Sequence, residues 1–203
     1  MKKLTIILLS LIISAAAVSC GSDNSDKNSS GNSSASSDAG TSQTQTETQS
    51  QDQTKSDKSA EDILASIKEV YGENYLPVTP ISDEMLSDQF GLSSDMYTDI
   101  AAEMPMIGFH PDRVIIIKAA EGKAEEAQAK LEAARQKLVD DSVQYPANIA
   151  KVSASQVVRN GDYVAFFLLG APDDRTEATE EEALEFARSE NAKAVDKFNE
   201  LTK

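Results

Sequence analysis

The sequence has few of the side chains that build most catalytic and metal centres. Its 203 residues include one cysteine, one histidine and no tryptophan. One cysteine cannot form an internal disulfide framework or the paired-cysteine ligands of a structural zinc site. The sequence also has no His-Glu-x-x-His, Gly-x-Ser-x-Gly, EF-hand calcium-loop or complete phosphate-loop motif. We therefore expect no cofactor and no metal ion.

Basic residues are also scarce. The chain has 19 Lys and Arg against 34 Asp and Glu, which gives a formal net charge of −15. Nucleic acid is bound by clustered Lys and Arg, so we expect no nucleic-acid partner. The same charge disfavours direct adhesion to anionic lipid. A large negative charge keeps a protein soluble, and capture of cations or cationic partners is the alternative interpretation.

The longest apolar run lies at the N-terminus and is short for a membrane span. Lys2 and Lys3 precede residues 4–18, which are apolar apart from three hydroxyl residues. A spanning helix needs about 20 apolar residues. A basic start, an apolar middle and small residues at the end are typical of an export signal. We predict a signal peptide over residues 1–19.

The single cysteine follows this segment. Ala17-Val18-Ser19-Cys20 resembles a bacterial lipobox, with Ala17 where Leu is more usual. The resemblance implies that Cys20 receives a diacylglyceryl group and becomes the first residue after cleavage. Two acyl chains hold a protein stably, since each buried CH₂ contributes about 0.8 kcal/mol. The predicted location is the outer face of the cytoplasmic membrane, and the alternative is a plain secretory signal with an incidental cysteine.

Two segments follow the predicted signal. Residues 20–59 are rich in Ser, Thr, Gln, Asn and Asp and have hardly any apolar side chain, so we predict a disordered linker. A flexible chain of this length spans roughly 35 Å on average. Residues 60–203 have the length and pattern of one domain, which we expect to be monomeric.

Periodicity predicts an α+β fold for that domain. The apolar run 113–120 is typical of a central strand, and residues 155–169 are typical of a hairpin with Asn160-Gly161 as its two-residue turn. The Thr179–Glu182 capping box predicts the start of the last helix. Further helices are predicted from residue 60, over 83–90 and over 123–143. We expect an antiparallel sheet of three or four strands with helices packed on one face.

Three stretches of the domain resemble one bacterial protein family. They are EMPM (103–106), DRVIIIKA (112–119) and NGDYVAFFL (160–168). They resemble domain of unknown function 4358, a lipoprotein family of Gram-positive bacteria, over about residues 92–170. The family carries no established activity, so the resemblance implies a lipoprotein without implying a mechanism.

One stretch combines several residue types that are common in binding sites. EMPMIGFHPDR (103–113) contains Glu103, His110 and Arg113, which we predict as binding residues. The alternative is an ordinary strand connection packed by Met104 and Phe109. His110 has no partner motif for nucleophilic catalysis, so we predict no catalytic residue.

Three functions are compatible with this sequence. The first is a non-enzymatic binding or accessory module at the cell envelope, with an unknown envelope protein or ligand as partner. The second is a hydrolase of envelope polymers, which would use two carboxylates about 5–9 Å apart. The third is a spacer without a specific ligand. The lack of a nucleophile–base or metal motif favours the first.

Overall fold

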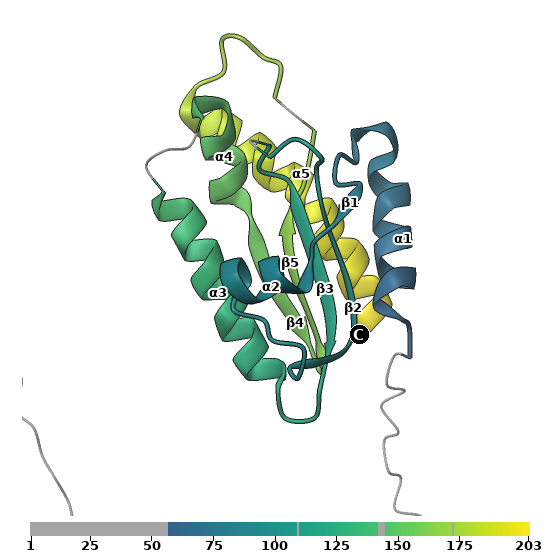
Figure 1. Cartoon of the computed structure of the whole chain (residues 1–203). Coiled ribbons are helices and arrows are strands. Elements are labelled where there is room, and N and C mark those ends of the chain that lie inside the picture. The colour runs from purple at the N-terminus through teal and green to yellow at the C-terminus, as the bar shows by residue number, and fades with distance from the viewer. Residues whose placement is uncertain (1–56, 109, 142–144, 172) are drawn as a thin grey trace, which may run out of the picture. The chain divides into compact units, whose positions relative to one another are not determined.

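The computed structural model describes residues 57–108, 110–141, 145–171 and 173–203 (Figure 1). The predicted signal peptide, Cys20, most of the predicted linker and Phe109 lie outside these residues. The five strands form one antiparallel sheet in the order β1-β2-β3-β5-β4. The elements in chain order are α1 (Ala60–Tyr71), the 3-10 turn η1 (Gly72–Asn74), β1 (Thr79–Pro80), α2 (Asp83–Phe90), β2 (Tyr97–Met104), β3 (Arg113–Ala119), α3 (Ala124–Asp140), α4 (Pro146–Ala154), β4 (Gln156–Asn160), β5 (Tyr163–Leu168) and α5 (Glu180–Thr202).

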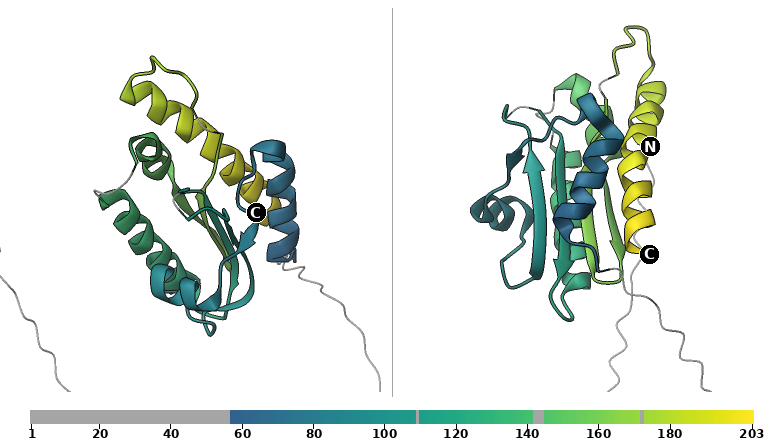
Figure 2. Two further views of the ribbon diagram at one scale, coloured as in Figure 1. Left: turned by 45° about the horizontal axis from the view of Figure 1, so that its top comes forward. Right: turned by 90° about the vertical axis from the view of Figure 1, so that its right-hand side faces the viewer.

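The prediction of an α+β fold with an antiparallel sheet is confirmed, and the sheet has one strand more than the upper expectation. The prediction of helices on one face is wrong. Helices α1 and α5 cover one face, and α2 and α3 cover the other (Figure 2). The reason lies in β3 and β5, whose side chains are apolar and buried on both faces, so that both faces require cover.

The two apolar layers follow from the period of two along the central strands. In β3, Ile115 and Ile117 pack with α2 and α3, whereas Val114 and Ile116 pack with α1 and α5. In β5, Phe166 belongs to the first layer, and its neighbours Ala165 and Phe167 belong to the second. The domain therefore has two cores separated by one sheet.

Local capping sets the ends of the predicted helices. The Ser59 hydroxyl accepts a hydrogen bond from the Asp62 amide at 3.1 Å, which caps α1. At α5, Thr179 and Glu182 form the predicted capping box. Helix α2 has the predicted bounds and ends at Gly91, whose φ of 69° is the left-handed conformation that favours glycine.

The predicted hairpin is present, but its turn lies one residue later than expected. Asn160 still pairs with Tyr163, so Gly161 and Asp162 are the turn residues. Gly161 has a φ of 58°, the positive value that type I′ and type II′ hairpin turns both require at their first central position. The Asn160 side chain instead donates to Asn199 and Thr202, both at 2.8 Å, and joins the hairpin to the end of α5.

Helix α4 was not predicted. The long helix α3 ends at Asp140, three residues before the predicted end at 143, and Pro146 begins α4 as its first residue. Proline is tolerated there because the first amides of a helix have no intrahelical acceptor. None of the helices in the described residues is both long and apolar enough to cross a bilayer.

The described chain enters the domain at the hairpin end of the sheet, which we define by the Gly161–Asp162 turn. Lys118, the penultimate residue of β3, pairs with Asp57 at 3.1 Å, and the Tyr163 hydroxyl donates to the Lys58 carbonyl. Helix α1 then runs to the opposite end of the sheet (Figure 1).

Candidate functional site

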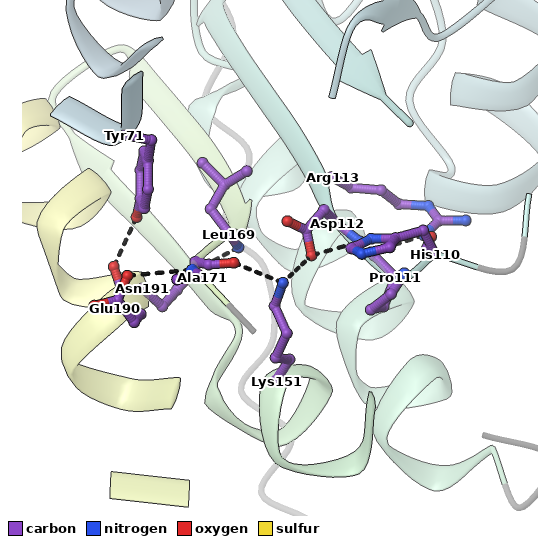
Figure 3. A network of polar contacts seen from close by, with 11 residues as sticks. Tyr71, His110, Pro111, Asp112, Arg113, Lys151, Leu169, Ala171, Glu190 and Asn191 are labelled. Atoms are coloured by element: carbon purple, nitrogen blue, oxygen red, sulfur yellow. Dashed lines mark hydrogen bonds and ion pairs between the residues drawn. The ribbon is translucent and has the colours of Figure 1, made fainter. Parts of the chain in front are cut away.

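A buried ion pair lies at the opposite end, where β3 begins and β5 ends (Figure 3). Asp112 directly precedes β3 and has no solvent exposure. The ammonium of Lys151, on α4, donates to Asp112 Oδ1 and also to the Gly170 carbonyl at 2.8 Å. The Lys151 side chain is 10% exposed, so the charge of each partner depends on the other.

His110 lies beside this pair. Its Nδ1 is 3.5 Å from Asp112 Oδ1 and accepts a long hydrogen bond, 3.4 Å, from the Asp112 amide. Burial lowers the pKa of His110, although the Asp112 carboxylate opposes that shift. The imidazole and the carboxylate are therefore neighbours that are not joined by a short hydrogen bond.

The environment of Asp112 disfavours the charged form of its carboxyl group. Burial raises the pKa of its carboxyl group, and Lys151 only partly offsets this effect. Its second oxygen, Oδ2, is buried and has no hydrogen-bond donor among the described residues. The ionised form of the buried Asp112 carboxyl group is therefore stabilised mainly by its contact with Lys151.

The polar network continues across the end of the sheet to α5 and α1. The Asn191 side chain accepts from the Leu169 amide at 3.0 Å and donates to the Ala154 carbonyl at 3.2 Å. Tyr71, on α1, donates to the Glu190 carbonyl at 2.7 Å. Burial raises the pKa of the Tyr71 hydroxyl, so it remains a neutral donor at neutral pH. These contacts fix α1, α4 and α5 to the ends of β3 and β5 (Figure 3).

The three predicted binding residues make contacts within the domain. Glu103 accepts from Lys68 at 2.7 Å and from the Tyr75 hydroxyl at 2.8 Å. Arg113 donates to the Pro111 carbonyl at 2.8 Å, and burial lowers its pKa. His110 and Arg113 thus lie in the Asp112 network, whereas Glu103 bonds to a separate pair of side chains.

Exposed apolar side chains lie at this same end. Among the described residues, the large apolar side chains that are exposed are Val70, Val78, Met106, Ile107, Tyr145 and Ile149. They come from the last turn of α1, the residue before β1, the β2–β3 connection and the start of α4, which all lie toward the end of the domain opposite the hairpin turn (Figure 1). We call this region the apolar end.

A pocket of about 140 Å³ lies between α4, the first turns of α5 and the connection before α5. Ala150, Ala183 and Phe186 are among the apolar residues that line it, and Lys151 and Asp173 also contribute. The lining includes one carboxylate, Asp173, which binds Arg175 through two contacts of 2.7 and 2.6 Å. The paired free carboxylates of a hydrolase are not found in this pocket.

The ion pair was not predicted from the sequence, although the sequence around Lys151 is unusual. Lys151 is the only charged residue in α4, whose sequence is PANIAKVSA. A lone lysine in a short apolar helix indicates a buried partner, but the sequence does not show which acid it is. No group of three or more His, Cys, Asp or Glu side chains in the described ranges could hold a metal ion.

These features define an α+β domain with a two-sided antiparallel sheet and a polar network at one end. Residues 70–169 match the family model of the domain of unknown function DUF4358, and the chain belongs to this family. The match covers β1 to β5 and includes both members of the buried ion pair. No curated protein and no solved structure matches the chain.

Proposed function

We propose that this protein is a lipid-anchored binding module on the outer face of the cytoplasmic membrane. The diacylglyceryl group on Cys20 is its anchor, and residues 20–59 are its tether. The lipobox and the polar composition of the linker support this part of the proposal. The domain itself acts by binding an envelope protein rather than by catalysis.

The observation that carries the binding role is the position of the exposed apolar side chains. Met106 is 80% exposed and Ile107 is 56% exposed, and both lie at the apolar end. Single exposed apolar residues are common, but apolar residues gathered at one place mark interaction surfaces. The described chain enters the domain near Lys118, at the hairpin end, whereas Met106 and Ile107 lie at the opposite end.

Glu103, His110 and Arg113 have a positioning role in this proposal. Glu103 ties the end of β2 to Lys68 on α1, and Arg113 binds carbonyls of its own connection. These contacts hold both ends of the segment that presents Met106 and Ile107. They support a preformed surface, which lowers the entropic cost of binding.

Site-specific photocrosslinking in cells of the source organism tests the proposal. A photoreactive amino acid at position 106 is expected to give a discrete crosslinked protein. The same amino acid at Glu121, exposed near the hairpin end, is the matched control. Equal crosslinking from both positions, or none from position 106, would contradict a binding role for the apolar end.

A further inference from the structure

The pocket between α4 and α5 has a chemical character that identifies a class of ligand. Five alanines line it, Ala150, Ala171, Ala178, Ala183 and Ala187. These small side chains leave a hollow of about 140 Å³. An apolar cavity of about 150 Å³ accommodates a benzene-sized molecule, so this pocket has room for one apolar side chain.

The charges inside the pocket are already balanced. Lys151 is paired with Asp112, and Arg175 is paired with Asp173 while its guanidinium lies 5.3 Å from the centre of the Phe186 ring. An acidic ligand would have to compete with these two carboxylates. The wall of the pocket is therefore suited to an uncharged, apolar group.

The rim of the pocket is acidic on one side. The connection before α5 and the first residue of α5 carry exposed acids close in sequence to lining residues, namely Asp174, Glu177 and Glu180, and we call these three the acidic rim. Tyr145 and Ile149, which are exposed, lie next in sequence to the lining residues Pro146 and Ala150. An apolar hollow with apolar neighbours on one side and acids on the other complements a basic, apolar peptide.

We propose that this pocket binds a peptide segment of a partner protein, in which one apolar side chain is flanked by Lys or Arg. The apolar side chain enters the alanine-lined hollow, and the flanking cations face the acidic rim. This inference rests on the binding role proposed above and names the chemistry of the partner. It does not depend on the lipid anchor.

Fluorescence anisotropy tests the proposal with three labelled peptides, KKSLSKK, KKSSSKK and EESLSEE. The full chain is purified in a mild zwitterionic detergent, so that the measurement does not require the lipid anchor, and the detergent alone gives the background. We expect KKSLSKK to bind at least about tenfold more tightly than either of the other two, because buried anchor side chains dominate such interfaces and steering depends on charge. Equal binding of the Leu and Ser peptides would overturn the pocket, and equal binding of the basic and acidic peptides would overturn the acidic rim.

Matched variants locate the binding site. Ala183→Leu fills the pocket, and we expect it to weaken KKSLSKK binding about tenfold. Ala133→Leu, on the exposed face of α3, should leave binding unchanged. Ala150→Leu fills the pocket from α4 and serves if Ala183→Leu does not fold. Glu177→Lys, next to the lining residue Ala178, should also weaken binding, whereas Glu125→Lys, an exposed acid in the first turn of α3, should not. Unchanged affinity in both filled variants would overturn the proposal.

Sedimentation of the same variants tests a different occupant. If the pocket binds a partner peptide and not a second copy of the chain, the sedimentation coefficient should not depend on protein concentration, either in the wild type or in Ala183→Leu. Concentration-dependent association that Ala183→Leu abolishes would show that a second copy of the chain occupies the pocket, and it would overturn the partner peptide. Failure of photocrosslinking at position 106 would not affect these measurements, so the two proposals can fail separately.

Discussion

Lys151 and Asp112 are 39 residues apart in the sequence and form a buried ion pair that joins α4 to the start of β3. The same ammonium binds the carbonyl of Gly170, just after β5. One side chain thus holds three chain segments together beneath the apolar end. Helix α4 has only nine residues, too few for a stable isolated helix, so its contacts with the rest of the domain hold it in place.

We expect Lys151→Met to lower the free energy of unfolding by about 3–5 kcal/mol, since removing one partner leaves the other charge buried and unpaired. Replacing both partners, with Lys151→Met and Asp112→Leu, should be less destabilising than the sum of the single changes. Urea unfolding measures each value. Lys137→Met, at an exposed position of α3, should change stability little. Strict additivity of the two single changes would show that the pair is not coupled.

The pH dependence of stability should reflect His110, the only histidine of the chain. Burial lowers the pKa of His110 in the folded protein. At a pH between this lowered pKa and the ordinary pKa of histidine, the unfolded chain therefore binds more protons than the folded chain. The contribution of His110 is therefore present above its ordinary pKa and is lost as pH falls through the lowered one. The raised pKa of Asp112 acts in the opposite direction, because its contribution increases as pH falls.

We expect the wild type to lose more stability than His110→Asn when the pH is lowered from about 7.5 to about 5.5, through the ordinary histidine range. Urea unfolding at several pH values measures the difference. His110→Asn also removes a charge that lowers the pKa of Asp112, and this change makes the variant lose less stability at low pH, in the same direction as the loss of the histidine itself. A parallel decline in the two proteins would contradict the effect of burial on His110.

Two glycines with positive φ should respond differently to alanine. At Gly161 the φ is 58° and a Cβ would have open space, so Gly161→Ala should cost only the left-handed strain, about 1–2 kcal/mol. At Gly170 a Cβ would lie 2.6 Å from the Glu190 Cβ on α5, and the φ is 143°. Gly170→Ala should therefore be clearly more destabilising. Thermal unfolding measures the melting temperature of each variant. An equal decrease in Gly161→Ala and Gly170→Ala would show that α5 moves aside at Gly170 without a cost in stability.

Cys20→Ser should leave an uncut precursor and abolish labelling by radioactive fatty acid, because no other thiol can accept the diacylglyceryl group. Ser22→Ala, two residues further on, is the control and should be cleaved and labelled normally. Immunoblots and membrane fractionation measure both outcomes. Normal cleavage of Cys20→Ser would indicate a plain secretory signal.

Much of the fold was determined by local sequence. The capping residues Ser59 and Thr179 set helix starts because their hydroxyl groups satisfy amides that the helix itself cannot. The run RVIIIKA predicted β3 because β-branched residues favour extended backbone. The hairpin was predicted to within one residue, and the exact turn depended on Asn160, which bonds to the distant Asn199.

Only the tertiary structure decided how the faces are covered and where the candidate sites lie. Apolar residues on both sides of β3 show that the strand is buried, but not that α1 and α5 share one of its faces. The pairing of Lys151 with Asp112 and the hollow beside Ala183 each join residues far apart in the chain. Local propensity acts over a few residues, whereas these contacts depend on packing of the whole sheet. That is why the sequence shows Lys151 as the only charged residue of segment 146–154, whereas only the fold shows its partner.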